Sequence, residues 1–141
     1  MSEIIHRTFA IVGSRSFFNR AVFDNVLIEI ISFEGIPNKI VSGGASGTDS
    51  LAYSWAEENN IEILVFRPNH KDFPKKVRRW EAPKARNTLI VTNSDIVIAF
   101  WDMKSSGTND TINKSIENGK KTYVYDFINA QLKIFTNAIK S

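Results

Sequence analysis

The chain has 141 residues, 43% of them hydrophobic, and a formal net charge of +3. This length supports one buried core and is short for two domains of ordinary size, so we expect a single globular domain over residues 1–141. The absence of cysteine excludes disulfides and thiolate metal sites and favours a reducing, cytoplasmic location. No apolar run approaches the roughly 18 residues of a membrane helix, and the N-terminus lacks a signal-peptide pattern, so we expect no membrane partner.

The apolar residues follow two alternating spacings along the chain. Short branched or aromatic runs, which suit buried strands, occupy residues 8–12, 39–41, 61–66, 95–100 and 122–125. Between them, helical spacing predicts helices over residues 21–31, from about residue 48, over residues 83–92 and over residues 109–118. A last helix is predicted near the C-terminus from four apolar residues at helical intervals, Ile128, Leu132, Phe135 and Ile139.

Strands that alternate with helices predict right-handed crossovers and a mostly parallel sheet with helices on both faces. We therefore expect an α/β fold with five strands in the order 3-2-1-4-5 and a C-terminal helix. In such a sheet, every turn from a strand to the next helix lies at the carboxyl edge, where ligands bind near the point at which the strand order reverses.

Residues 67–86 form a basic segment with eight lysines and arginines against two acidic residues. Residues 68–81 show no clear apolar period, so we expect a loop there. A basic loop on an otherwise mildly acidic chain favours an anionic partner, such as a phosphate, a nucleotide or a nucleic acid. A solvated loop whose lysines keep the protein in solution is the alternative.

Three predicted strand-to-helix turns are rich in glycine and hydroxyl residues. The candidate binding residues are Gly13, Ser14 and Arg15 after the first strand, Ser42, Gly43, Gly44, Ser46, Gly47, Thr48 and Asp49 after the second, and Trp101, Ser106, Gly107 and Thr108 after the fourth. Glycine lets the backbone approach a ligand, free amides at a helix N-terminus attract anions, and an indole suits stacking on a base. Ordinary helix capping explains either Ser-Gly-Thr turn (residues 46–48 and 106–108) alone, but two of them at one edge favour a phosphate or nucleotide site.

Charged side chains accompany these turns. Arg86 and Asn87 lie on the helix before the fourth strand, where the guanidinium is placed to clamp a phosphate with two hydrogen bonds. The carboxylates in or beside the turns are Asp49, Asp102 and Asp110, and each suits a general base or an acceptor for a ribose hydroxyl. Asp49 and Asp110 also fall in first helical turns, where acids favour the helix dipole. The histidine, aspartate and glutamate residues form no cluster with metal-ligand spacing, so we expect no metal and no other cofactor.

Six stretches occur in order between Phe9 and Val124, namely FAIVGSRSF, IVSGGASGTDSLAYSWAEE, APKARN, DIVIAFWD, SSGTNDTI and NGKKTYV. Together they resemble the SLOG superfamily of Rossmann-like domains, most closely its small stand-alone YspA-like members. The resemblance covers nearly the whole chain. It implies a Rossmann-like nucleotide-binding domain that forms a homodimer or a larger homo-oligomer.

Two branches of that superfamily place different functions on this pattern. The first branch is the lonely-guy phosphoribohydrolases, which cleave the N-glycosidic bond of nucleoside monophosphates. Arg86 of this chain is similar to an active-site arginine of those enzymes, and Gly107 and Thr108 are similar to a Gly-Thr in their active-site loop. The catalytic glutamate of that loop falls on Thr111, and Asp110 would point about 100° round a helix from it. In the DNA-processing protein A family, a similar domain binds single-stranded DNA.

Three hypotheses follow. The first is a sensor or sequestering protein that binds a nucleotide or a nucleotide-derived ligand in the glycine-rich turns. The second is an N-glycoside hydrolase of nucleoside monophosphates, in which Arg86 acts with Asp110 or Asp49 in place of the glutamate. The third is a single-stranded DNA-binding protein, which the basic segment suits, although only Phe73 and Trp80 interleave aromatic rings with its charge.

Overall fold

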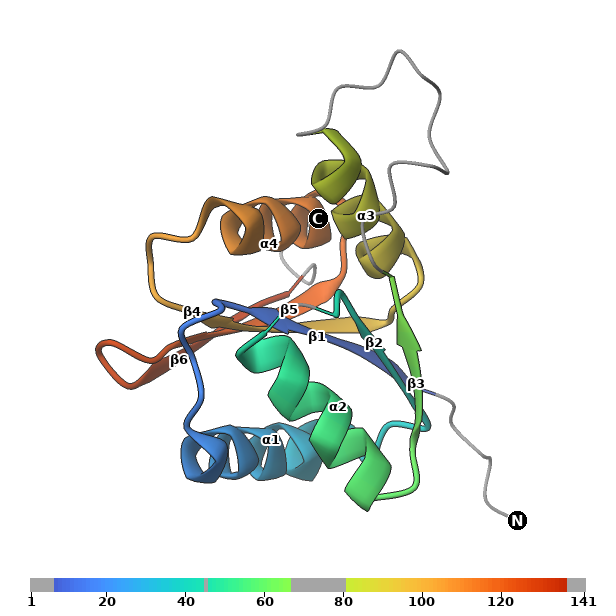
Figure 1. Cartoon of the computed structure of the whole chain (residues 1–141), viewed down its shortest axis with the longest axis vertical. Coiled ribbons are helices and arrows are strands. Elements are labelled where there is room, and N and C mark those ends of the chain that lie inside the picture. The colour runs from blue at the N-terminus through green and yellow to red at the C-terminus, as the bar shows by residue number, and fades with distance from the viewer. Residues whose placement is uncertain (1–6, 45, 67–80, 137–141) are drawn as a thin grey trace.

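Six strands form one sheet in the computed structural model, which describes residues 7–44, 46–66 and 81–136 (Figure 1). The strands are β1 (Thr8–Gly13), β2 (Lys39–Ser42), β3 (Glu62–Val65), β4 (Ile96–Trp101), β5 (Lys121–Asp126) and β6 (Gln131–Phe135). The helices are α1 (Arg20–Glu34), α2 (Thr48–Glu58), α3 (Glu81–Thr92) and α4 (Ser106–Glu117). The sheet order is β3-β2-β1-β4-β5-β6, which confirms the predicted order of the first five strands.

The strand order reverses at β1. Phe9 of β1 pairs in parallel with Ile40 of β2 on one side and with Ile96 of β4 on the other. β3 and β5 continue the sheet outward, also in parallel. The loops that leave β1, β2 and β4 therefore meet at the carboxyl edge of the sheet, where an α/β fold binds its ligands.

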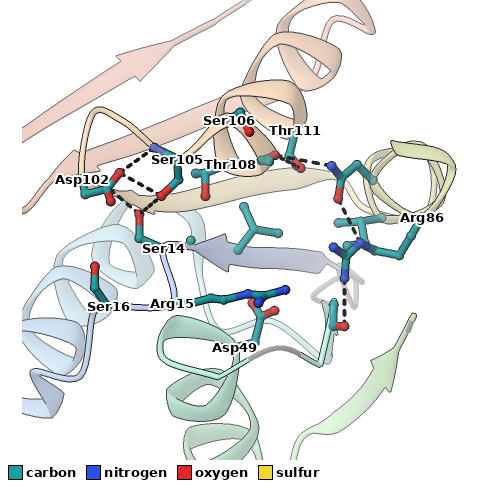
Figure 2. A pocket seen from close by; sticks show the side chains of 16 residues that line it. Ser14, Arg15, Ser16, Asp49, Arg86, Asp102, Ser105, Ser106, Thr108 and Thr111 are labelled. Atoms are coloured by element: carbon teal, nitrogen blue, oxygen red, sulfur yellow. Dashed lines mark hydrogen bonds between the residues drawn. The ribbon is translucent and has the colours of Figure 1, made fainter. Parts of the chain in front are cut away.

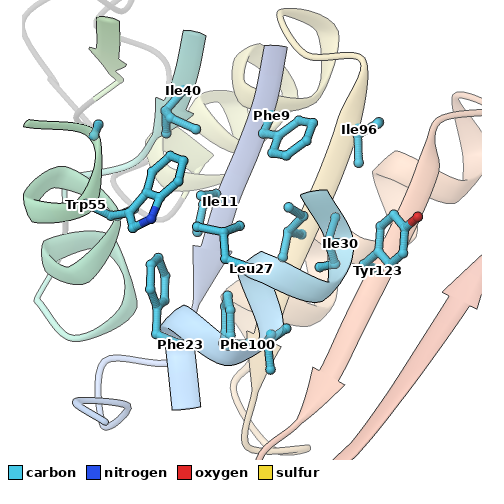
Figure 3. Packing of buried hydrophobic residues seen from close by; sticks show 14 of the residues in the cluster. Phe9, Ile11, Phe23, Leu27, Ile30, Ile40, Trp55, Ile96, Phe100 and Tyr123 are labelled. Carbon is cyan, nitrogen blue, oxygen red and sulfur yellow. The ribbon is translucent and has the colours of Figure 1, made fainter. Parts of the chain in front are cut away.

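Each face of the sheet carries its own apolar cluster, and a pair of helices covers each face (Figure 1). The cluster under α1 and α2 includes Phe9, Ile11, Phe23, Leu27, Trp55 and Phe100 (Figure 3). The cluster under α3 and α4 includes Val12, Ile90, Val97 and Ile112. Burial of one such side chain stabilises a fold by about 1.5–3 kcal/mol.

No helix in the described part of the chain is long and apolar enough to cross a membrane.

Helix α1 begins and ends at the residues that carry its signals. The Asn19 side chain caps the helix by accepting a hydrogen bond from the Val22 amide at 3.1 Å. Gly35 ends it with a φ of 87°, and its amide donates to the Ile31 carbonyl at 2.8 Å. The helix predicted over residues 21–31 is therefore confirmed, and it extends to Glu34 before Gly35 ends it.

The helix predicted near the C-terminus is wrong, because that segment forms a sixth strand. β6 pairs with β5 in antiparallel fashion. The chain reverses before β6 because the Asp126 carboxylate accepts hydrogen bonds from the amides of Ile128 and Asn129 at 3.0 and 3.1 Å. Of the apolar residues that suggested a helix, Leu132 packs on the core, Ile128 is 64% exposed in the turn, and Ile139 lies outside the described residues.

Candidate functional site

A pocket of about 510 Å³ opens at the carboxyl edge, between α3 and the loops that follow β1, β2 and β4 (Figure 2). Its lining consists of Val12, Gly13, Ser14, Arg15, Ser16, Gly43, Asp49, Arg86, Asn87, Ile90, Asp102, Ser105, Ser106, Gly107, Thr108 and Thr111. These residues lie far apart in the sequence, and the reversal of strand order at β1 brings them together. The pocket therefore lies at the edge where the sequence predicts a binding site.

The first Ser-Gly-Thr turn holds two loops together. The hydroxyl of Thr48, a fully buried residue, donates to the Ser14 carbonyl at 3.0 Å. Gly47 has a φ of 73°, and a Cβ at this position would lie 2.3 Å from the Arg15 carbonyl oxygen. The backbone conformation and the close approach both require glycine here. Residues 46–48 themselves are not in the described lining, whereas the next residue, Asp49 in the first turn of α2, lines the pocket.

The second Ser-Gly-Thr turn forms the first turn of α4 and lines the pocket. Its cap residue, Ser105, makes no side-chain hydrogen bond to the helix. Gly107 has no positive φ, and a Cβ built at this position would meet no atom within 4 Å. Among the described residues, nothing requires glycine at 107, but its lack of a side chain lets a ligand approach the amides of this turn.

Arg86 reaches the pocket from α3 and bonds to the loop after β2. Its Nη1 donates to the Gly43 carbonyl at 2.9 Å, and its Nε donates to Asn87 Oδ1 at 3.0 Å. A Cβ at position 43 would lie 2.3 Å from this Nη1, so glycine is needed for the contact. Burial lowers the pKa of Arg86, the Asp49 carboxylate raises it, and the charge of Arg15 lowers it. The guanidinium nevertheless stays protonated, and it is a fixed positive charge in the pocket.

The Asn87 side chain holds the Arg86 guanidinium in place through a hydrogen bond. While its Oδ1 accepts from Arg86, its Nδ2 donates to the Asp110 carboxylate at 3.0 Å and to the Gly107 carbonyl at 3.4 Å. Lys114 donates to the same carboxylate at 2.8 Å. Because Asn87 is only 4% exposed, its amide would be costly to leave unpaired, and this network fixes which way the amide faces. The network also joins α3 to α4.

Position 111 faces the pocket and position 110 faces α3. Thr111 lines the pocket, and its hydroxyl donates to the Gly107 carbonyl at 3.2 Å. Asp110 is not among the described lining residues, and its carboxylate is engaged by Asn87 and Lys114. This arrangement matches the rotation expected between the two positions. A catalytic role for Asp110 stays a prediction.

Asp102 organises the loop between β4 and α4. Its Oδ1 accepts hydrogen bonds from the Lys104 amide at 2.9 Å, the Ser105 amide at 2.8 Å and the Ser105 hydroxyl at 2.9 Å. Burial acts to raise the pKa of Asp102, but these donors and the Ser14 hydroxyl lower it to about 2. Asp102 is therefore a carboxylate at physiological pH and is unsuited to general acid catalysis.

Comparisons with known proteins show a likeness in fold. No family model and no curated protein matches the chain. DNA processing protein A from Streptococcus pneumoniae is similar with a TM-score of 0.64 and 24% identity, over 84% of this chain and 50% of that one. DNA processing protein A from Helicobacter pylori, described in its single-stranded DNA binding mode, is similar with a TM-score of 0.61 and 23% identity, over 84% of this chain and 64% of that one. The chain thus spans between 50% and 64% of these proteins, and they share its Rossmann-like fold.

The structure brings some of the predicted binding residues together and leaves others outside the pocket. Those in the lining are Gly13, Ser14, Arg15, Gly43, Asp49, Arg86, Asn87, Ser106, Gly107 and Thr108. Those outside it are Ser42, Gly44, Ser46, Gly47, Thr48 and Trp101. The Trp101 indole donates to the Ser105 carbonyl at 3.0 Å and so supports the loop, while its stacking on a base stays a prediction.

Four lining residues were not among the predicted binding residues, namely Val12, Ser16, Ile90 and Ser105. Ser105 follows Asp102 by three residues, a spacing at which an aspartate commonly accepts from the backbone, so this signal was present. Ile90 lies one helical turn after Arg86, on the same face of α3. Residues 67–80 of the basic segment lie outside the described residues, and Lys84 and Arg86 lie on α3. Within the described ranges, no group of three histidine, aspartate or glutamate residues is placed to hold a metal ion.

Proposed function

We propose that the pocket binds a nucleotide through its phosphate. The proposal is carried by the open first turn of α4, where Gly107 leaves free space and the Ser105 side chain is engaged with Asp102 rather than with the helix. Helix N-terminal amides attract a phosphate through their unpaired N–H groups and the helix dipole. Arg86 and Arg15 add positive charge to the same pocket.

The size and the lining of the pocket favour a small ligand. Its volume of about 510 Å³ lies within the range of roughly 300–1,000 Å³ that is typical of small-molecule sites. None of the lining residues that the structure describes is aromatic, so a base has no stacking surface there, whether it belongs to a nucleotide or to a strand. The volume is therefore what favours a nucleotide or a nucleotide-derived ligand over a strand.

Isothermal titration calorimetry with nucleoside mono-, di- and triphosphates tests this proposal. We expect the wild-type protein to bind at least one of them. The Arg86→Lys variant should bind it roughly tenfold more weakly or worse, because an ammonium group cannot reproduce the two-pronged contact of a guanidinium. A panel without any binding, or wild-type affinity in Arg86→Lys, would contradict the proposal.

Arg20→Lys is the matched control for the arginine substitution. Arg20 lies at the start of α1, where it is paired with Asp24 at 2.7 Å and with Glu58 at 2.9 Å, and it does not line the pocket. We expect this variant to bind nucleotides as the wild type does. Comparison of the two variants separates a loss of binding at the pocket from a general effect of replacing an arginine.

Single-stranded DNA is the second candidate ligand, and the fold likeness to DNA processing protein A favours it. The basic composition of residues 67–86 suits a phosphate backbone. Fluorescence anisotropy with a labelled oligodeoxynucleotide, measured over a series of salt concentrations, tests this candidate. Binding of the strand that falls steeply with salt, together with no binding of free nucleotides, would favour DNA as the ligand.

Cleavage of the bound nucleotide would need an acid or a base next to the glycosidic bond. The carboxylates in the described lining are Asp49 and Asp102, and the pKa of Asp102 is lowered to about 2, so Asp102 is a poor general acid and a weak general base. Asp49 is therefore the better placed candidate, because Asp110 is engaged with Lys114 and Asn87. Chromatography for free base after incubation with each nucleotide separates a hydrolase from a binding protein. Release of base that is lost in Asp49→Asn would identify a hydrolase.

A further inference from the structure

A chain of hydrogen bonds runs from α4 to Arg86, the arginine that reaches the pocket from α3 (Figure 2). Lys114 donates to the Asp110 carboxylate at 2.8 Å and to the Lys84 carbonyl at 2.7 Å. Asn87 then connects this carboxylate to the Nε of Arg86. Neither Lys114 nor Asp110 is among the described lining residues of the pocket. Any effect of this ion pair on a ligand must therefore pass through Asn87 and Arg86.

The chemistry of the two end groups fixes the direction of the Asn87 amide. A carboxylate accepts hydrogen bonds, and a guanidinium only donates them. Asn87 lies between these groups, so its Nδ2 must face Asp110 and its Oδ1 must face Arg86. Without the carboxylate, the acceptor that remains for Nδ2 among the described contacts is the Gly107 carbonyl, at the longer distance of 3.4 Å. Asp110 therefore determines which atom of Asn87 meets the arginine.

The same arrangement keeps two opposite charges apart. Both hydrogen bonds described for Arg86 go to neutral oxygen atoms, those of Asn87 and Gly43. The negative charge of Asp110 is matched by Lys114, four residues further along the helix. A carboxylate at position 87 would hold the guanidinium equally well but would neutralise it. The neutral amide thus fixes Arg86 without taking up its positive charge.

We propose that Asp110 is a positioning residue, which acts through Asn87 to hold Arg86 in place for an anion without neutralising it. The proposal rests on the nucleotide binding proposed above only for the identity of that anion. Asp110 acts without touching the ligand, so this role differs from that of a general acid or base. Lys114 supports the role because it matches the charge of Asp110 on the side away from Asn87.

Hydrogen exchange of the Arg86 Nε–H group, followed by nuclear magnetic resonance on the isotope-labelled protein, tests the positioning. The signal is assigned by its loss in Arg86→Lys. We expect slow exchange in the wild type, because this group is hydrogen-bonded to Asn87. Asp110→Ala should raise the exchange rate roughly tenfold or more. An unchanged rate in a folded Asp110→Ala variant would overturn the proposal. Exchange in the wild type at the rate of free arginine would overturn it even if the variant fails to fold.

Asp24→Ala is the matched control for this substitution. Asp24 is also the carboxylate of an ion pair between residues four apart, with Arg20 at 2.7 Å, and it is not among the described lining residues. We expect this variant to speed exchange of the Arg20 Nε–H group, which donates to Asp24, and to leave that of Arg86 unchanged. Faster exchange at Arg86 would mean that loss of any such ion pair loosens the arginine, and it would count against a specific role for Asp110.

Transposing the two side chains tests the separation of charge. When Asn87→Asp is combined with Asp110→Asn, the carboxylate at position 87 can accept from Arg86 and from the amide at position 110. We expect this protein to fold and to keep slow exchange at Arg86. It should nevertheless bind inorganic phosphate and the preferred nucleotide roughly tenfold more weakly or worse, because Arg86 is then neutralised. Wild-type affinity in this variant would overturn the claim that the amide preserves the charge of Arg86.

The exchange and binding measurements separate this proposal from the proposed function. If the wild type binds inorganic phosphate but no nucleotide, the proposed function is wrong and both tests of Asp110 still apply. If it binds neither, the claim about the charge of Arg86 is wrong as well, and the exchange rates alone decide whether Asp110 holds the arginine. If nucleotides bind and Asp110→Ala changes neither the exchange rate nor the affinity, nucleotide binding stands and the role of Asp110 is wrong.

Discussion

The two Ser-Gly-Thr turns share a sequence and differ in what their atoms contact. In the first turn, the Thr48 hydroxyl is buried against the Ser14 carbonyl, and Gly47 lies against the backbone of Arg15. In the second turn, Gly107 has free space around it, and Thr108 lines the pocket. One copy holds the loops together, and the other places a helix N-terminus in the lining of the pocket.

The difference begins with the residue at which each helix starts. α2 starts at Thr48, so Gly47 is the cap and its φ of 73° sets the direction of the chain. α4 starts at Ser106, so all three residues of the second copy lie within its first turn and Ser105 is the cap. A repeated tripeptide therefore does not repeat its role, because a small shift in the helix start changes which atoms are free.

Alanine substitution of the two glycines should give the largest contrast. Gly47→Ala places a Cβ 2.3 Å from a backbone oxygen in a conformation that side chains rarely adopt, so we expect a loss of roughly 3 kcal/mol or more in the free energy of unfolding. Gly107→Ala adds a methyl group in free space within a helix, so we expect unchanged stability or a gain of up to about 1 kcal/mol. Urea unfolding of both variants measures these changes.

Nucleotide titration of Gly107→Ala completes this comparison. The added methyl group covers the amides of the first turn of α4, so we expect affinity to fall by roughly tenfold while the fold is kept. Gly47→Ala should lose much of its free energy of unfolding, but at a temperature where it is folded its affinity for nucleotides should fall by less. If Gly107→Ala binds nucleotides as tightly as the wild type, the first turn of α4 is not the phosphate site.

The order of strands and helices was predictable because burial dictates it. Runs such as residues 96–100 are buried on both faces of a parallel sheet and are therefore apolar throughout. β6 was not predictable by the same rule, because it is an edge strand in which Leu132 packs on the core while Ile134 and Phe135 are partly exposed. Its apolar spacing reflects an Asp126 turn followed by a half-exposed strand, and it imitates a helix by chance.

The location of the pocket was predictable, but the orientation of its side chains was not. Glycine-rich turns at one edge predict where a pocket forms, since topology brings those turns together. That Thr48 turns to Ser14 while Thr108 turns to the pocket depends on tertiary contacts that no local pattern encodes. The network from Arg86 through Asn87 to Asp110 likewise depends on how α3 packs on α4.

Valine in place of each threonine gives a smaller contrast between the turns. Thr48→Val removes the 3.0 Å hydrogen bond to the Ser14 carbonyl, which keeps only longer bonds from the amides of Phe17 and Thr48, at 3.3 and 3.4 Å. We expect a loss of about 1 kcal/mol in the free energy of unfolding. Thr108→Val should change stability by less than about 0.5 kcal/mol and weaken nucleotide binding several-fold. Urea unfolding and calorimetry on the same preparations measure both effects, and equal destabilisation by the two substitutions would contradict the division of roles.

Acid should loosen the second turn before the first, and this is the smallest effect that we expect. The bond that holds Thr48 joins neutral groups, whereas the loop before α4 is held by the Asp102 carboxylate, whose pKa is lowered from 3.8 to about 2. A carboxyl group whose pKa is lower in the folded state adds stability above about pH 4, and that stability is lost as the pH falls toward 2. Urea unfolding from about pH 5 to about pH 3 should therefore show a steeper fall for the wild type than for Asp102→Asn. Other carboxyl groups with a lowered pKa, such as Glu34 and Asp126, are present in both proteins, so the difference between the two slopes reports on Asp102 alone. Parallel slopes would mean that the ionised carboxylate does not hold this loop.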